Sequence, residues 1–225
     1  KITKERLLNG NRDYDDDPTK LYEYDDICDL FTNHGESGQH YITCDIARLG
    51  NDSTVAIVWD WWIWRVFTRK KNRTTETVNF LHWLQRQYQV KNSDTICDED
   101  WVGGGVVDQM ECKGFVNNSS PILSPEEKQI RNYKNLKDQC YFELQQIIES
   151  WKMQLIVMDS DDKDLIIEEL DVIKQKNPDK WGKLQILSKD EIKSLIGRSP
   201  DRSDAIAMRM RFELNKTPEL DIYFI

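Results

Sequence analysis

Residues 40–68 read HYITCDIARLGNDSTVAIVWDWWIWRVFT and contain three apolar segments separated by short turns. The segments 41–46, 53–60 and 63–68 are rich in β-branched and aromatic residues, a composition typical of strands. We therefore expect three successive antiparallel strands. A tight turn is expected at residues 60–62, where the tryptophans have a packing role.

A helix and a fourth strand follow this unit. Residues 74–88 carry apolar side chains at the spacing of a helix with one buried stripe, and residues 94–97 form a short strand. A helical connection of this length between two strands favours parallel pairing, which would place the fourth strand beside the first. Asp45 and Asp98 would then be neighbours at one end of the sheet.

The rest of the chain mixes helices and strands, which indicates an α/β fold. Helices are predicted over 21–31, 103–112, 130–152, 161–174 and 204–214, and strands over 114–116 and 183–187. Residues 117–129 are predicted to form a loop.

Three acidic residues, far apart in the chain, stand at the edges of apolar elements. Asp45 follows YITC, Asp98 follows TIC, and Asp204 lies in GRSPDRSDA at 197–205. Three carboxylates brought together repel one another strongly unless a divalent cation lies between them. The sequence therefore predicts a metal site formed by these three residues.

Two further residues have alternative interpretations. Asp201 either caps the last helix or adds a metal ligand, because a helix N-terminus favours an anion in both roles. Lys189 approaches a substrate phosphate, neutralises the carboxylates or is simply an exposed lysine. The glycines at 103–105, after Asp98, allow close approach of the backbone, whereas no P-loop pattern occurs in the chain.

Composition indicates a globular enzyme domain. The 225 residues are 39% hydrophobic, and the chain shows neither a signal peptide nor an apolar run near the roughly 20 residues that span a bilayer. The five cysteines form no C-x-x-C pair, which argues against a zinc site and a disulfide framework. We expect a soluble protein of a reducing compartment.

The net charge of -9 argues against tight independent binding to DNA. Basic stretches do occur locally, at 65–71, at 128–131 and at Lys134. A nuclease with this charge would have to be delivered to DNA by something else.

The motifs YITCDIARLGNDSTV at 41–55, CDEDWVGGGVVD at 97–108, and Lys189 with GRSPDRSDA at 197–205 occur in this order. In order and spacing they resemble the C-terminal nuclease domain of tailed-phage large terminase subunits. The resemblance covers nearly the whole chain and is specific as a combination. It implies a ribonuclease H-like fold, a mixed sheet of three antiparallel strands followed by parallel strands with helices on both faces.

The resemblance also implies a metal-dependent endonuclease that hydrolyses double-stranded concatemeric DNA. By similarity, Asp45, Asp98 and Asp204 would bind two Mg²⁺ or Mn²⁺ ions, with Asp201 as a possible further ligand and Lys189 among the catalytic residues. The implied partners are viral DNA, the ATPase domain of the same full-length protein, the small terminase subunit and the portal, in the cytoplasm of the infected bacterial host. Residues 1–39 would be a connector after an absent ATPase domain, and 40–225 the nuclease domain.

Two other functions remain open at this point. A nuclease of the same fold that resolves Holliday junctions or resembles integrases would share the carboxylates, but it would need a basic DNA-binding face or a dimer surface. A non-catalytic docking module would carry the same acids as relics of a former site or as residues of solvated turns.

Overall fold

The computed structural model describes residues 17–47, 52–100, 102–122, 132–157, 159–177 and 182–214. The basic stretch 128–131 lies outside these ranges, as does most of the turn between the first two predicted strands. All five cysteines are free thiols. None of the helices in the described ranges combines the length and apolar composition that crossing a bilayer requires.

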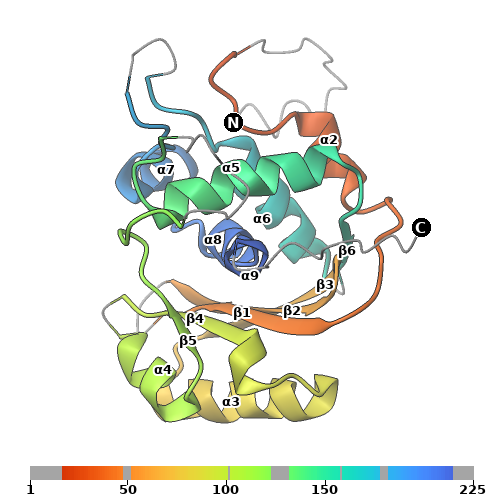
Figure 1. The fold of residues 1–225 in the computed structure, drawn as a ribbon. Coiled ribbons are helices and arrows are strands. Elements are labelled where there is room, and N and C mark those ends of the chain that lie inside the picture. Colours follow the sequence, from red (N-terminus) through yellow and green to blue (C-terminus); the bar gives the residue numbers. More distant parts are fainter. Residues whose placement is uncertain are drawn as a thin grey trace, which may run out of the picture.

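A six-stranded mixed sheet forms the centre of the molecule, in the order β5-β4-β1-β2-β3-β6 (Figure 1). Its strands are β1 (His40–Asp45), β2 (Ser53–Asp60), β3 (Ile63–Lys70), β4 (Thr95–Asp98), β5 (Lys113–Phe115) and β6 (Gln154–Ile156). The first three strands pair antiparallel, and β4 lies parallel to β1. The predicted topology of the first four strands is therefore confirmed.

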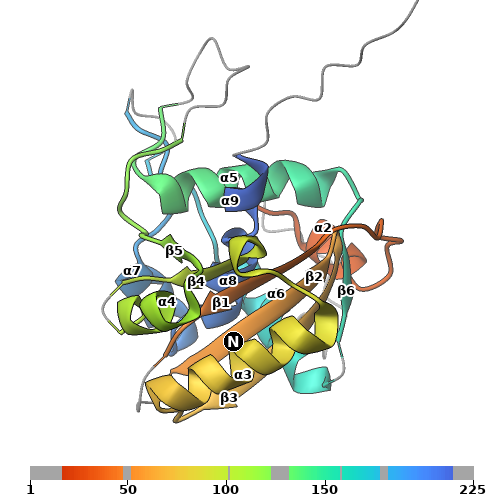
Figure 2. The same ribbon diagram turned by 60° about the horizontal axis from the view of Figure 1, so that its bottom comes forward.

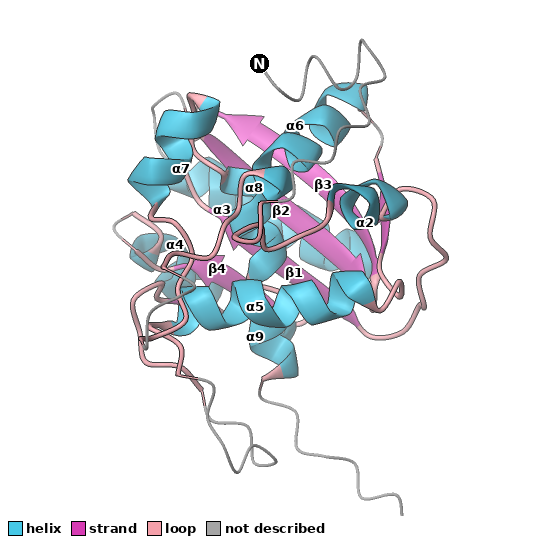
Figure 3. Ribbon diagram, turned by 90° about the horizontal axis from the view of Figure 1, so that it is seen from above, coloured by secondary structure: helices cyan, strands magenta, loops and turns pink. Residues whose placement is uncertain are grey.

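Helices cover both faces of this sheet. They are α2 (Tyr24–Asp29), α3 (Thr74–Tyr88), α4 (Gly104–Met110), α5 (Leu136–Glu149), α6 (Ser160–Asp171), α7 (Lys189–Ile196), α8 (Asp201–Ala207) and α9 (Met210–Glu213), with a short 3-10 helix η1 at Asn92–Asp94. Helices α3 and α4 pack on one face (Figure 2). The others lie on the opposite face (Figure 3). There, α8 lies between α5 and the sheet (Figure 1).

Strand alternation divides the core into two layers. In β1, Ile42 and Cys44 pack against α3 and α4, whereas Tyr41 points into the core on the α5 side. Because successive side chains of a strand point to opposite faces, Asp45 faces the same side as Tyr41. In β4, Ile96 packs in the core on the α5 side, so Asp98, two residues further along the strand, also faces that side.

Several predicted elements differ from the structure. Residues 183–187 form only single bridges, from Leu184 to Tyr133 and from Ile186 to Gln175, so the predicted strand is wrong. Ile186 is 5% exposed. Its burial accounts for the apolar pattern of residues 183–187, although these residues do not pair with a neighbouring strand. The three-residue strand β6 was missed, since so short a segment carries little periodicity.

The helical boundaries near the C-terminus also differ. The predicted helix 204–214 is two helices, α8 and α9, and α8 begins three residues earlier, at Asp201. Helix α7 was not predicted. Within the described residues, α5 is shorter than the predicted 130–152, and Trp151, inside the predicted range, lies beyond the end of α5 and is 61% exposed.

Residues 17–39 pack against this body. The backbone N–H of Leu21 donates to the carbonyl of Ile173, and the Tyr22 hydroxyl donates to the carbonyl of Tyr141. Ile27 and Leu30 are fully buried in the core on the α5 side. This part of the predicted connector thus shares its core with the sheet.

Candidate metal centre

Two carboxylates lie side by side at the carboxyl ends of neighbouring strands. Cys44 of β1 pairs in register with Cys97 of β4, so Asp45 and Asp98 occupy the next positions of two parallel strands. Both face the α5 side of the sheet, and Asp45 is 4% exposed. The predicted proximity of these two residues is present in the structure.

Helix α8 brings two more carboxylates over the same strands. It packs on β1 and β2, and the Thr43 hydroxyl donates a 2.7 Å hydrogen bond to the carbonyl of Ala205. Small residues permit this approach, since Ala205 and Ala207 are 0% and 2% exposed. Asp201 and Asp204 lie one turn apart in this helix, and both are buried.

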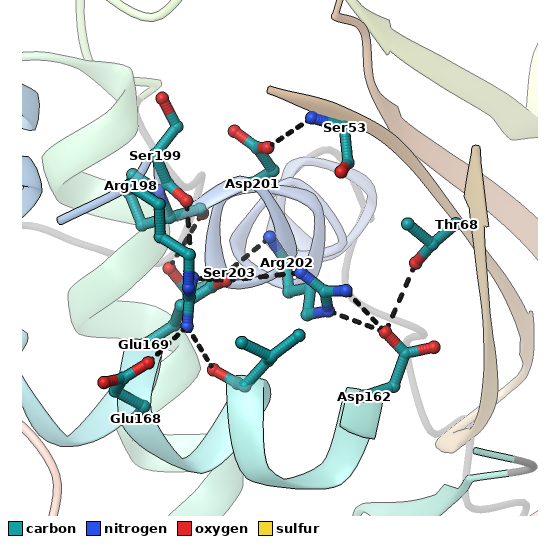
Figure 4. A network of polar contacts seen from close by, with 12 residues as sticks. Ser53, Thr68, Asp162, Glu168, Glu169, Arg198, Ser199, Asp201, Arg202 and Ser203 are labelled. Atoms are coloured by element: carbon teal, nitrogen blue, oxygen red, sulfur yellow. Dashed lines mark hydrogen bonds and ion pairs between the residues drawn. The ribbon is translucent and has the colours of Figure 1, made fainter. Parts of the chain in front are cut away.

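Asp201 is not the cap of its helix. Pro200 occupies the N-cap position, and Asp201 is the first residue of α8. Its Oδ2 accepts a 2.8 Å hydrogen bond from the backbone N–H of Ser53, at the start of β2 (Figure 4). Asp201 therefore ties the helix to the sheet, and the helix-cap alternative is wrong because the helix begins earlier than its sequence predicts.

Both oxygens of Asp204 contact cationic side chains. Oδ1 lies 2.6 Å from Nζ of Lys137 and accepts a 2.6 Å hydrogen bond from the Tyr141 hydroxyl. Oδ2 lies 3.4 Å from Nζ of Lys189. Lys189 begins α7 and thus reaches the carboxylates, as one of its alternatives predicted, although its side chain is 46% exposed.

The sequence reasoning missed Lys137 and Tyr141. They lie four residues apart on α5 and therefore share one face of that helix. Each directly follows a residue of the apolar stripe that α5 buries, Leu136 and Cys140 respectively. A lysine next to the buried apolar stripe of a helix is the sequence signal that could have identified Lys137.

The carboxylates influence one another electrostatically. Burial raises the pKa of Asp45 well above its usual value, and the negative charges of Asp204, Asp201 and Asp98 raise it further. The positive charge of Lys189 opposes this rise. Burial likewise raises the pKa values of Asp98 and Asp201. A bound cation stabilises a site in which carboxylates lie close together and protein cations neutralise only part of their charge.

The pKa of Asp204 shifts in the opposite direction because Lys137 and Lys189 contact its carboxylate. Burial disfavours its ionised form, but Lys137 and Lys189 outweigh that effect and keep its pKa below the usual value. The pKa of Lys189 is raised in turn, since the negative charges of Asp204 and Asp45 outweigh the partial desolvation of its ammonium group. Asp204 is therefore an anion in a cluster where the other carboxyl groups ionise reluctantly.

The donor chemistry of this cluster fits Mg²⁺ or Mn²⁺, which take carboxylate oxygens as ligands. Among the described residues, however, no three acidic, histidine or cysteine side chains are arranged so that they already enclose one ion position. Lysine ammonium groups and a tyrosine hydroxyl contact both oxygens of Asp204. A cation that bound here would take over part of those contacts.

The backbone after Asp98 is held closely. Oδ1 of Asp98 accepts hydrogen bonds from the N–H of Asp100, at 3.0 Å, and from Nδ2 of Asn117, at 3.4 Å. A Cβ added at Gly103 would lie 1.7 Å from the carbonyl oxygen of Asp98. The close backbone approach predicted for the glycines is therefore present at Gly103.

A buried network fixes the start of α8 (Figure 4). Oε2 of Glu169, from α6, accepts hydrogen bonds from the N–H groups of Arg202, at 2.8 Å, and Ser203, at 2.9 Å. Oε1 of Glu169 pairs with the guanidinium of Arg198. Arg202 in turn donates to Asp162 at 2.6 and 2.8 Å. Glu169 thus serves as the N-terminal cap that α8 lacks in its own sequence, a role that the sequence did not reveal.

Solved structures resemble this fold, whereas no protein-family model and no curated protein sequence matches the chain. One similar structure is a lysine-to-alanine variant of the nuclease domain of the large terminase subunit gp2 of bacterial virus Sf6, with manganese and beta-thujaplicinol. It has a TM-score of 0.73 and 17% identity over 89% of this chain and 100% of that chain. Another is the large terminase nuclease from thermophilic phage G20c with bound magnesium, with a TM-score of 0.55 and 14% identity over 86% of this chain and 97% of that one.

These likenesses agree with the arrangement of the strands and the helices. The sheet has three antiparallel strands with parallel strands added at both sides, and helices on both faces. The predicted α/β, ribonuclease H-like fold is confirmed. This chain has the fold of the nuclease domains of phage large terminase subunits.

Proposed function

We propose that this chain is the nuclease domain of a phage large terminase subunit and that it hydrolyses phosphodiester bonds of double-stranded DNA. The observation that carries the proposal is the meeting of Asp45, Asp98 and Asp204, from three remote segments, on one face of the sheet. The fold supports it, since the similar structures are nuclease domains.

The proposed metal ligands are Asp45, Asp98 and Asp204, with Asp201 as a further ligand. Two divalent cations, Mg²⁺ or Mn²⁺, would supply Lewis-acid stabilisation of the phosphate and a nucleophilic hydroxide. Manganese, calcium and magnesium are named in the descriptions of the similar structures.

The side chains around the ligands have separate tasks. Tyr141 holds Oδ1 of Asp204 by its hydrogen bond, which fixes the orientation of that carboxylate. Lys189 lies next to Oδ2 and is exposed on one side, so that its ammonium group can neutralise a phosphate oxygen beside the carboxylates. Glu169 and Ser53 hold α8, and with it Asp201 and Asp204, in position over the strands.

The wider assignment follows from the same proposal. Residues 1–39 would be the connector from an ATPase domain, and 40–225 the nuclease domain. The partners would be that ATPase domain, the small terminase subunit, the portal and concatemeric viral DNA, in the cytoplasm of the bacterial host. A motor that delivers the DNA would account for a nuclease with a net charge of -9.

The test is cleavage of supercoiled plasmid in the presence of manganese. We expect the wild-type protein to nick and linearise the plasmid, and Asp45→Asn and Asp98→Asn to abolish cleavage while leaving the fold intact by circular dichroism. Asp108→Asn is the control, because Asp108 is an exposed carboxylate on α4. An intact plasmid at all protein concentrations would refute the nuclease function, and cleavage restricted to branched DNA would favour a junction-resolving enzyme.

A further inference from the structure

A polar groove lies beside the carboxylates. Its walls come from the first turn of α5 with the residues just before it, from Asn117 and Asn118, and from residues 185–189 leading into α7. Its volume is about 320 Å³, in the lower part of the range of roughly 300–1,000 Å³ that is typical of ligand sites.

The groove is continuous with the candidate metal centre. Asp100 and Asn117, which donate hydrogen bonds to Asp98, belong to its lining. So do Lys137 and Lys189, which contact the two oxygens of Asp204. A polymer that entered the groove would therefore pass directly by the carboxylates.

The lining of the groove is rich in lysines for an acidic protein; Lys137 and Lys189 pair with Asp204, and Lys176 pairs with Glu191. The cationic lining residues are Lys134, Lys137, Lys176 and Lys189. Only two aspartates, Asp100 and Asp138, are among the described residues that line it, whereas the whole chain has a net charge of -9. An anionic ligand therefore gains more from this surface than from the average surface of the molecule.

The other lining groups favour a phosphate backbone over bases. Four amide side chains, Asn117, Asn118, Asn135 and Gln185, also line the groove, and those of Asn117 and Asn135 already donate to Asp100 and Asn118. None of the described lining residues is aromatic, so this part of the groove lacks the stacking surfaces on which proteins hold unpaired bases. Lysines and amides without aromatic rings are suited to contacts with phosphate oxygens.

We propose that this groove binds the backbone phosphates of the DNA strand being cut, on one side of the scissile bond. Lys134 and Lys176 are the phosphate contacts outside the metal centre. The proposal rests on the nuclease function proposed above and adds to it the path of the substrate strand.

Lys176 can change its partner at small cost. Its Nζ lies 2.7 Å from Oε1 of Glu191, and the two side chains are 38% and 42% exposed. Ion pairs exposed to this extent contribute little to stability, because solvent screens them. A phosphate beside Lys176 would replace the pair with Glu191 without a large loss.

The first experiment measures binding of a fluorescent 30-base-pair duplex by anisotropy, with calcium in place of manganese, at several salt concentrations. We expect the double variant Lys134→Gln, Lys176→Gln to bind several-fold to tenfold more weakly than wild type. The slope of log affinity against log salt should fall by about 0.9 for each phosphate that the variant no longer neutralises. Lys91→Gln is the control, because Lys91 is an exposed lysine just before η1, at the opposite end of β4 from Asp98.

A second pair of variants separates a phosphate contact from a structural ion pair. Lys176→Gln should weaken binding, whereas Glu191→Gln frees Lys176, removes a nearby negative charge and should leave binding equal or tighter. Equal weakening by both substitutions would mean that only the ion pair matters and would overturn the role of Lys176. Melting temperatures check that the change in the Glu191 capping box of α7 has not unfolded the variant.

The outcomes distinguish this proposal from the nuclease proposal. A wild-type protein that binds the duplex through these lysines but never cuts it refutes the nuclease function alone. A wild-type protein that cuts, while the double variant keeps the wild-type affinity and salt slope, refutes the groove alone. The absence of any salt-dependent binding by the wild-type protein also overturns the groove.

Discussion

The ammonium group of Lys137 lies 2.6 Å from Oδ1 of Asp204, and the lysine side chain is 15% exposed. This buried pair joins the first turn of α5 to α8. It places a protein cation next to a carboxylate that we propose as a metal ligand. Lys137 thus provides, before a metal binds, part of the positive charge that the carboxylates require.

Lys137→Gln should therefore lower the stability of the metal-free protein and increase its response to metal. Removing one partner of a buried ion pair costs about 3–5 kcal/mol, and a cation bound at Asp204 would restore part of that loss. We expect the rise in melting temperature on addition of MnCl₂, measured by differential scanning fluorimetry, to be larger in the variant than in the wild type. An equal rise in both proteins would contradict this role.

Tyr141→Phe removes a hydrogen bond but keeps the ring that packs in the core. The Tyr141 hydroxyl donates to Asp204 at 2.6 Å and lies 3.0 Å from the Ser203 hydroxyl, which retains its own hydrogen bond to the Pro200 carbonyl. Hydrogen bonds to charged groups contribute about 1.5–3 kcal/mol. We expect cleavage to slow about tenfold, with a lower kcat and an unchanged KM for plasmid, because Asp204 loses its orientation. A change confined to KM would argue against that explanation.

Gly103→Ala should displace Asp98, because the new Cβ would meet its carbonyl oxygen at 1.7 Å. We expect a lower melting temperature and loss of manganese-dependent cleavage. Gly105→Ala is the matched control, since a Cβ there meets nothing within 4 Å. It should keep full activity and gain about 0.5–1 kcal/mol, as alanine favours a helix over glycine. Similar effects of both substitutions would contradict the role of Gly103.

Glu169 should make the stability of the protein depend on pH. Burial raises its pKa from 4.5 to about 7, against the opposing charges of Arg198 and Arg202. Between these two pH values the folded state binds more protons than the unfolded state, so its stability falls as the pH rises from about 4.5 to about 7. The shift corresponds to about 3 kcal/mol of differential stability, at roughly 1.4 kcal/mol for each pKa unit.

The measurement is urea unfolding of wild type and Glu169→Gln at pH 5 and pH 7.5. The variant lacks the titrating group, so its loss of stability between the two pH values should be smaller than that of the wild type. It should also be less stable at pH 5, because an amide N–H₂ then faces the guanidinium of Arg198. Equal pH dependence in the two proteins would show that Glu169 does not titrate in this range.

Local patterns in the sequence predicted much of the sheet. The bounds of β2 and α3 agree with the prediction residue for residue, because their signals, an apolar run of β-branched residues and a helical stripe, lie within the elements themselves. Asp45 and Asp98 were recognisable for the same reason, since each ends a short buried strand. The parallel pairing of β4 with β1 followed from the length of the connection alone.

The sequence by itself therefore determined the strand order around β1 and the positions of the acidic residues in their elements. Only the tertiary structure decided what surrounds Asp204, since Lys137 and Tyr141 lie more than 60 residues away in the chain. It also decided that Glu169 of α6 caps α8 and that residues 183–187 remain outside the sheet. The physical reason is that periodicity and turn chemistry act between near neighbours, whereas an ion pair, a cap from another helix or the pairing of a three-residue strand depends on which distant surfaces meet.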